Sequence, residues 1–425
     1  MRVAFYTLGC KLNQAETESL VSQFSQSGFQ LVSPHDAADI YIANTCTVTH
    51  IADRKSRHWL RLARRRNPRA LIIATGCYAQ RSRQELTQLA DFVVDNKEKE
   101  HLLAFTQTLS FEERGLGEGE AKQSQMLAAT VRTRSLIKIQ DGCHGPCTYC
   151  IVPKVRPREY SLPSSQIIDE VKQKVALGYK EVVLTGTKVG SYRDGSADLR
   201  DLVQRILRDT GIERLHLSSL QPSEISSEFL VLWQDERLCR HFHLALQSGS
   251  ETVLQRMRRS YPLDQYQRTI NLIKEKIPKV AITTDILVGF PGESAEEFEQ
   301  SYSFCQQAGF ANIHVFPFSP RPETAAAMMP EQIKDKVKQE RNQRMLALSR
   351  SCRRRFCEQF LGQIMPVLWE KETSPGSGIY SGLTGNYIRV FAYSEKSLSN
   401  EITPVKLVEF HNRGIRGEVM DENSS

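Results

Sequence analysis

Three cysteines, Cys143, Cys147 and Cys150, lie within eight residues of one another. They come directly after a β-rich run, Leu136–Gln140, and cysteine thiolates are the ligands that hold iron–sulfur clusters. Three thiolates bind three irons of a cubane and leave the fourth iron open to a small molecule that offers an amine and a carboxylate. The spacing therefore predicts a reactive 4Fe–4S cluster with these three cysteines as the catalytic residues.

The alternative is a structural zinc site in which His144 is the fourth ligand, because sites with three cysteines and one histidine are common. His144 directly follows Cys143, and the backbone makes it awkward for two adjacent residues to bind one ion. We favour the cluster on this ground.

A second set of cysteines, Cys10, Cys46 and Cys77, is spread over the first part of the chain. Each follows an apolar run, and the runs are Phe5–Leu8, Ile40–Ala43 and Leu71–Ala74. In a parallel sheet the loops after such strands share one edge, so the three thiols could converge on a second site. Otherwise they are three unrelated buried cysteines. Metal binding or redox chemistry is favoured over disulfides in a cytosolic chain.

The elements that position these cysteines begin with alternating strands and helices. Helical patterns at Ala15–Ser27 and Asp53–Arg66 separate the apolar runs, which predicts an N-terminal α/β sandwich with a parallel sheet over residues 1–110. A polar, glycine- and glutamate-rich linker is predicted at 111–128.

Residues 129–358 contain six β-like runs that alternate with helical patterns. The runs are Leu136–Gln140, Glu181–Thr185, Arg214–Leu220, His241–Gln247, Ala281–Val288 and Asn312–Phe318. A long helix is expected after them, at about Glu331–Phe360. Six βα units predict an open (βα)6 partial barrel, and active sites of such barrels lie at the carboxyl ends of the strands, where Cys143 falls.

Small and polar residues stand at the ends of the later strands, and we expect them to bind a cofactor as a group. They are Thr185, Gly186, Thr187, Ser219, Gln247, Ser248 and Gly289. Any one of them alone is better explained by turn chemistry. Their common place at the mouth of the predicted barrel favours binding, and glycines there let the backbone approach a ligand closely.

Residues 359–421 change to short β-rich runs separated by Gly, Ser, Asn and Pro, which predicts a small all-β barrel. Its aromatic side chains, such as Tyr387 and Phe391, either stack on bases or fill the barrel, and we favour filling.

The net charge of +7 is unevenly distributed: Arg54 to Arg69 holds eight Lys or Arg and no acid, and Arg353–Arg355 form a second run. Such runs are either solvated helix faces or contacts for a polyanion such as a phosphate backbone. No stretch of 18 apolar residues and no signal-peptide pattern occurs, so we expect a cytoplasmic protein without a membrane span.

The motif Gly142–Cys150 resembles that of the radical S-adenosylmethionine superfamily, and nearly the whole chain resembles the methylthiotransferases within it. The resemblance implies that Cys10, Cys46 and Cys77 hold a second 4Fe–4S cluster, whose open iron presents the sulfur to be transferred. It implies S-adenosylmethionine as the cofactor that one electron splits into a radical. It also implies that the C-terminal barrel is an RNA-binding TRAM domain.

Four segments resemble the branch of this family that modifies N6-threonylcarbamoyladenosine, just 3′ of the tRNA anticodon. They are Gly9–Gln14, Asn44–Thr49, Ala52–Arg57 and Gly76–Gln80. Lys11-Leu12 differs from the Gln-Met or the Pro usual in the other branches. The segment Lys154–Arg158 departs from the family's Tyr-Ala-Arg-Gly-Arg pattern, although both arginines are kept.

The resemblance implies insertion of a methylthio group at C2 of that adenine, a C–H bond that general acid–base chemistry does not reach. The expected partners are the tRNA anticodon stem-loop, an unidentified electron donor and an unidentified sulfur source, with neither DNA nor a membrane. Two alternatives stay open: the same chemistry on a ribosomal-protein side chain, and a non-enzymatic RNA-binding protein that contains zinc.

Overall fold

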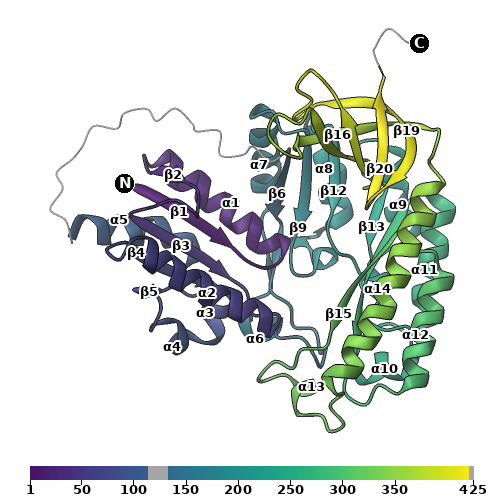
Figure 1. Cartoon of the computed structure of the whole chain (residues 1–425), viewed down its shortest axis with the longest axis horizontal. Helices are drawn as coiled ribbons and strands as arrows, with labels where there is room; N and C mark the ends of the chain where they lie inside the picture. Colours follow the sequence, from purple (N-terminus) through teal and green to yellow (C-terminus); the bar gives the residue numbers. More distant parts are fainter. Residues whose placement is uncertain (113–132, 421–425) are drawn as a thin grey trace.

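Three groups of strands follow one another along residues 1–112 and 133–420, which are the residues that the computed structural model describes (Figure 1). The linker predicted at 111–128 lies outside the described residues except for Phe111 and Glu112, which end helix α5 (Leu102–Glu112). Among the described residues, no helix is long and apolar enough to cross a membrane.

The N-terminal sheet has five parallel strands in the order β2-β1-β3-β4-β5. The strands are β1 (Arg2–Thr7), β2 (Gln30–Val32), β3 (Ile40–Thr45), β4 (Leu71–Gly76) and β5 (Phe92–Val93). The helices are α1 (Lys11–Gln26), α2 (His50–Arg66), α3 (Cys77–Arg81), α4 (Arg83–Leu86) and α5, with a 3-10 turn η1 (Lys99–His101). Phe24 of α1 belongs to the core on one face and Trp59 of α2 to the core on the other. The predicted α/β sandwich is confirmed.

Two helices of this sheet begin earlier than the apolar pattern predicts. Helix α1 begins at Lys11, because Cys10 is its N-cap and the Cys10 carbonyl accepts the Gln14 N–H at 3.2 Å. Helix α2 begins at His50, because the Thr49 hydroxyl accepts the Ala52 N–H at 3.2 Å. Both helices therefore start directly behind a cysteine-bearing loop.

The central sheet has six parallel strands. They are β6 (Arg134–Lys138), β9 (Glu181–Thr185), β12 (Arg214–Leu217), β13 (His241–His243), β14 (Ala281–Val288) and β15 (Asn312–Pro317). One half of the sheet has the order β12-β9-β6 and the other half has the order β13-β14-β15. The two halves are joined next to β12 and β13, where the Leu220 N–H donates to the His243 carbonyl at 2.9 Å and Leu220 forms a parallel bridge with Leu244. The sheet is open at β6 and β15, which confirms the predicted (βα)6 partial barrel.

Helices lie along the outside of this sheet (Figure 1). The longer ones are α7 (Ser164–Ala176), α8 (Leu199–Asp209), α11 (Leu263–Lys276), α12 (Ala295–Ala308) and α14 (Asp335–Glu358). Shorter helices lie in the segments between these elements: α6 (Val152–Val155), α9 (Ser227–Leu230), α10 (Glu251–Arg256) and α13 (Ala325–Met328), with 3-10 turns at η2 (Val189–Ser191), η3 (Pro222–Glu224) and η4 (Val231–Gln234). Two short antiparallel pairs complete this region, β7 (Gln140–Asp141) with β8 (Tyr160–Ser161) and β10 (Arg193–Asp194) with β11 (Ala197–Asp198).

The C-terminal strands form a closed barrel in the order β16-β17-β18-β20-β19, which confirms the predicted small all-β barrel. They are β16 (Ile364–Glu372), β17 (Ile379–Thr384), β18 (Arg389–Tyr393), β19 (Ile402–His411) and β20 (Gly414–Val419). The β-rich runs of this region, Met365–Trp369, Tyr387–Tyr393 and Thr403–Phe410, do not include β17 or β20, because each of these strands contains a glycine with a close neighbour. A side chain at Gly382 would meet Val367 at 2.5 Å, and one at Gly417 would meet Val405 at 2.4 Å.

Tyr387 lies outside the barrel, in the turn before β18. Its ring stacks on His216 and His241 of the central sheet at centroid distances of 4.2 and 4.7 Å, and its hydroxyl donates to Glu181. Phe391 alternates with barrel-core residues along β18 and faces outward. The expectation that these two rings fill the barrel is wrong: Tyr387 instead docks the barrel onto the central sheet.

Candidate active site at the junction of two cysteine trios

The first trio lies in the loops that follow β1, β3 and β4, at one edge of the N-terminal sheet. A side chain at Gly9 would come within 3.0 Å of the Cys46 sulfur, which places the Cys10 and Cys46 loops against each other. Burial, helped by the charges of Cys77 and Cys10, raises the pKa of Cys46 to about 12. The structure thus brings the three thiols together, because adjacent parallel strands end at the same edge.

The Cys77 sulfur accepts hydrogen bonds from two side chains, and the loop before it is tightly packed. Gly76 before it has a left-handed φ of +97°, and a side chain there would meet the Thr45 carbonyl oxygen at 2.4 Å. The Cys77 sulfur accepts the Arg156 Nε–H at 3.4 Å and the Asn96 Nδ2–H at 3.9 Å. Both donors approach the sulfur from outside the cysteine loops.

The second trio lies between β7 and α6, at the mouth of the partial barrel. Cys143 accepts the Gly145 N–H at 3.2 Å, and Cys147 accepts an Arg259 Nη1–H at 3.2 Å. Burial, with the charges of Cys147 and Cys143, raises the pKa of Cys150 to about 12. These three thiols are therefore also electrostatic neighbours.

The donor chemistry of both trios fits an iron–sulfur cluster. Among the described residues, no three Cys, His, Asp or Glu side chains are arranged to hold a single metal ion. A cluster binds each thiolate on a different iron, so its ligands surround a volume rather than a point. The His144 imidazole contacts the Pro157 carbonyl at 2.7 Å and lies 3.5 Å from Glu159, which directs it to the 157–159 segment.

The α3–α6 contact brings the segments of the two trios together. Cys77 at the start of α3 packs with Ile151 and Val155, and Ile151 is the residue after Cys150. The edge of the N-terminal sheet that carries the first trio therefore contacts the segment that carries the second trio.

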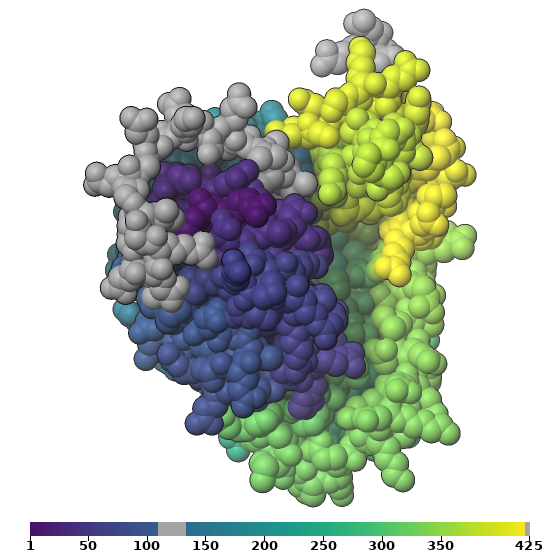
Figure 2. All heavy atoms as spheres, turned by 60° about the vertical axis from the view of Figure 1, so that its left-hand side comes forward, coloured from purple at the N-terminus to yellow at the C-terminus, as the bar shows by residue number. Residues whose placement is uncertain are grey.

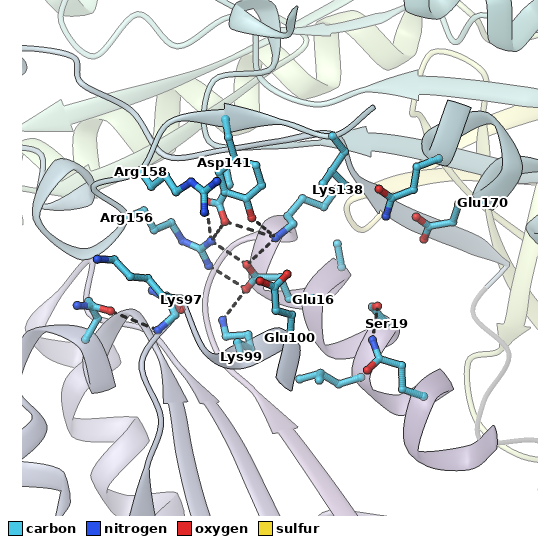
Figure 3. Close-up of a pocket in the computed structure, with 18 of the residues that line it drawn as sticks. Glu16, Ser19, Lys97, Lys99, Glu100, Lys138, Asp141, Arg156, Arg158 and Glu170 are labelled. Carbon is cyan, nitrogen blue, oxygen red and sulfur yellow. Dashed lines mark hydrogen bonds and ion pairs between the residues drawn. The ribbon is translucent and has the colours of Figure 1, made fainter. Parts of the chain in front are cut away.

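A buried network of charged side chains joins the N-terminal domain to the central sheet at this contact (Figure 3). The Arg156 guanidinium donates to Glu16 at 2.8 and 2.9 Å, to Asp141 at 2.7 Å and to the Asn13 amide oxygen at 2.8 Å. Lys99 donates to Glu16 at 2.6 Å from the opposite side. Burial alone would raise the pKa of Glu16, but Lys99 and Arg156 hold it well below its usual value. The network lines a cavity of about 420 Å³, where Lys97 and Arg158 are also found.

A second buried bridge joins the first trio to the loop after β15. Thr47, the residue after Cys46, donates to Asp53 at 2.6 Å, and Asp53 accepts from Arg81 at 3.0 Å. Arg321, only 1 % exposed, reaches the same Asp53 at 2.5 Å. One carboxylate thus holds two guanidinium groups from two domains.

The residues predicted to bind a cofactor lie at or after the ends of strands of the central sheet, but their surroundings differ. Thr187 comes within 3.4 Å of Asp141, and a side chain at Gly186 would meet the Gln140 carbonyl at 2.8 Å, so this loop reaches the second trio's segment. Thr185 is buried, Ser219 is exposed, and Gln247 continues the pairing of β13 with β14 through Ile286.

Packing alone accounts for two members of that group. The Ser248 hydroxyl bonds to Ser301 of α12 at 3.0 Å, which directs it away from the barrel mouth. A side chain at Gly289 would meet Lys338 of α14 at 2.4 Å. Their assignment as cofactor contacts stays a prediction.

Sequence reasoning missed the charged residues that support the trios. The sequence pattern does not single out five of them, namely Glu16, Lys99, Asp141, Arg259 and Arg321. Arg156 stands out only as one of the two arginines that the segment Lys154–Arg158 shares with the family pattern. Asp53 lies in the segment Ala52–Arg57, where a single acid beside Arg54, Lys55 and Arg57 is the signal that points to a buried ion pair.

Comparison with known proteins matches two family models. The radical SAM superfamily matches residues 137–305, and the uncharacterized protein family UPF0004 matches residues 2–95. The threonylcarbamoyladenosine tRNA methylthiotransferases MtaB of Bacillus subtilis and Aquifex aeolicus are 36% and 37% identical, over 96% and 92% of this chain and 94% and 96% of theirs. The tRNA-2-methylthio-N(6)-dimethylallyladenosine synthase of Syntrophotalea carbinolica is 32% identical over 98% of this chain and 99% of its own.

Among solved structures, the radical S-adenosylmethionine methyltransferase TsrM from Kitasatospora setae with cobalamin and a 4Fe-4S cluster bound shares the fold. It aligns with a TM-score of 0.56 at 15% identity over 77% of this chain and 74% of its own.

Proposed function

The chain belongs to the methylthiotransferase family of radical S-adenosylmethionine enzymes, and we propose that it inserts a methylthio group at C2 of N6-threonylcarbamoyladenosine in tRNA, giving 2-methylthio-N6-threonylcarbamoyladenosine. The observation that carries the proposal is the α3–α6 contact, where Cys77 of one trio packs against Ile151, the residue after Cys150 of the other. Two reactive sites on segments that contact each other allow a radical and a sulfur to reach the same substrate carbon.

We assign one 4Fe–4S cluster, with an open iron for S-adenosylmethionine, to Cys143, Cys147 and Cys150. We assign a second cluster to Cys10, Cys46 and Cys77. When bound, these groups supply the electron, the radical and the sulfur by which a methylthio group replaces the C2 hydrogen. The division into an N-terminal domain (1–110), a radical core (129–358) and a TRAM barrel (359–421) follows from this assignment.

The chain's own residues hold these groups in place. Arg259 donates to Cys147 and Arg156 to Cys77, and hydrogen bonds to ligand sulfurs help to set a cluster's reduction potential. Arg156 and Arg321 are buried between the domains and keep the two sites at a fixed separation. The side chains that connect the two sites, Arg156, Glu16 and Asp141, are buried, which limits the access of water to this part of the junction.

The proposed partner is the anticodon stem-loop of tRNA, together with an electron donor and a sulfur source. The MtaB relatives carry the threonylcarbamoyladenosine name over nearly the full length of this chain. Helix α2 supports a phosphate backbone partner, because Arg54, Lys55, Arg61 and Arg65 are exposed along it. A cytoplasmic location follows from this substrate.

Mass spectrometry of tRNA nucleosides from a deletion strain tests the substrate. We expect N6-threonylcarbamoyladenosine without its methylthio group, with restoration by the wild-type gene but not by the Cys143→Ala/Cys147→Ala/Cys150→Ala variant. Unchanged 2-methylthio-N6-threonylcarbamoyladenosine would refute the assignment. Loss of a methylthio group from a ribosomal protein instead would place the chain in that branch.

A further inference from the structure

Strand β15 is the last strand of the open sheet, and the elements beside it form a groove. Among the described residues it pairs only with β14 along one side. Helix α14 covers the start of its other side, where the Ser349 hydroxyl accepts the Ile313 N–H at 3.3 Å and donates to the Ile313 carbonyl at 2.8 Å. Beyond Ile313 the edge borders a groove of about 640 Å³ between α14 and the β19–β20 hairpin.

The groove is basic and partly aromatic. Its charged lining consists of Arg350, Arg353 and Arg354 of α14 and Arg413 of the hairpin turn, and no Asp or Glu lines it. Phe316 of β15 is 46 % exposed. This lining suits a partner that has both negative charge and flat rings.

Several of these charges lack a carboxylate partner. Arg350 and Arg413 are exposed, and no ion pair involves either within the described residues. Arg353 holds the Asn312 amide oxygen at 2.6 Å, and burial together with the nearby charge of Arg413 lowers its pKa. Only Arg354 pairs with an acid, Glu358 at 2.7 Å. Like charges gathered without an acid between them are stabilised by an anion that bridges them.

The inner end of the groove reaches the interior of the partial barrel. The His314 ring of β15 lies 5.6 Å from that of His243 on β13, which pairs with Asp285 at 3.2 Å. Figure 2 shows a hollow between the purple N-terminal domain and the yellow barrel, with the green segment below the barrel on the same side. His314 therefore connects the lining of the groove with a side chain on the inside of the partial barrel.

We propose that this arginine groove, formed by β15, α14 and the β19–β20 turn, binds the phosphate backbone of the substrate RNA. The inference rests on the proposed function and adds a surface apart from helix α2, where the β19–β20 turn of the C-terminal barrel meets α14 and β15. Arg350, Arg353 and Arg413 contact phosphates, and Phe316 stacks on an unpaired base.

The test measures binding of an anticodon stem-loop RNA to the iron-loaded protein as salt is varied. The variant is Arg350→Ala/Arg413→Ala, whose side chains make no ion pair among the described residues. The matched control is Arg268→Ala/Arg344→Ala, which removes the same charge from side chains paired with Asp264 and Glu299 outside the groove. Iron content and unfolding temperature of each variant are measured on the same samples.

We expect the groove variant to bind about tenfold more weakly at about 0.1 M salt, with the slope of log K against log salt reduced by about 1.4 for two lost contacts. Stem-loops with and without threonylcarbamoyladenosine should lose affinity equally, because phosphates carry no base identity. Phe316→Ala should weaken binding without changing the slope, because stacking releases no counterions.

The groove assignment is overturned if the groove variant and the control keep the wild-type affinity and slope while the wild-type protein binds and modifies RNA. If the wild-type protein binds no stem-loop at all, the proposed function itself fails and the groove assignment with it.

Discussion

Arg156 is the residue on which the junction of the two trios depends most. It is 5 % exposed, and it neutralises Glu16 and Asp141 while donating to the Cys77 sulfur. Arg156→Met should lower the free energy of unfolding by about 3–5 kcal/mol, because two carboxylates lose a buried partner. Chemical unfolding measures this loss. The control is Arg158→Met, an exposed arginine two residues away, which should leave stability nearly unchanged. Equal effects of the two variants would refute a special role for Arg156.

The cysteine assignments predict a stepwise loss of iron. Anaerobically reconstituted wild-type protein should hold about eight irons, and the alanine variant of Cys143, Cys147 and Cys150 should hold about four. The alanine variant of Cys10, Cys46 and Cys77 should lose the other half. Elemental analysis for iron and zinc checks this. Zinc in place of iron, or a loss of all iron from either variant, would contradict two independent clusters.

Spacing was enough to predict that the cysteines of each trio lie together. It could not reveal the charged side chains that contact them. Cys143, Cys147 and Cys150 are close in sequence, and the apolar runs before Cys10, Cys46 and Cys77 place those loops on one edge. Glu16, Lys99 and Arg156 are far apart in the chain and are joined only by the docking of two domains. Ser248 was predicted to bind a cofactor because it is a polar residue near a strand end. Its hydroxyl instead bonds to Ser301 of helix α12, and the sequence does not distinguish these two roles.

At the scale of elements, the periodic runs predicted the strands well and their ends less well. The six central runs became the six parallel strands, because each is apolar and bounded by turn residues. Helices α1 and α2 begin earlier than predicted because caps at Cys10 and Thr49, rather than apolar spacing, determine where they begin. In the C-terminal barrel, Gly382 and Gly417 interrupt the pattern where strands cross closely.

The contact between the C-terminal barrel and the central sheet should weaken in mild acid. Burial and the nearby charge of Lys11 lower the pKa of His216 and His241 well below the usual 6.5. The unfolded chain therefore takes up protons first, so stability is lost as pH falls below about 6.5, by up to about 1.4 kcal/mol per pH unit for each histidine.

Unfolding measured between about pH 7.5 and 5.5 tests this contact. His216→Gln should flatten the pH dependence, and the exposed His58 replaced by Gln should not. A wild-type stability that does not change over this range would show that these rings are not held neutral.

At the scale of the molecule, the central sheet contacts both other domains, the N-terminal domain along one side and the C-terminal barrel at one end (Figure 1). The order of the domains could be predicted from composition, but their docking could not, because it depends on single side chains that cross the interfaces. Arg321 reaches Asp53 from the loop after β15, and Tyr387 reaches Glu181 from the C-terminal barrel. The same docking creates the arginine groove, whose basic residues come from segments far apart in the chain.

The most direct test of the whole account is anaerobic turnover by the reconstituted protein on an anticodon stem-loop that carries N6-threonylcarbamoyladenosine. S-adenosylmethionine, a reductant and a sulfide source are supplied, iron is measured on the same sample, and the nucleosides are identified by mass spectrometry. The account predicts about eight irons per chain and a methylthio group at C2 of the modified adenine. A fully iron-loaded sample that splits S-adenosylmethionine but leaves this nucleoside unchanged would contradict it.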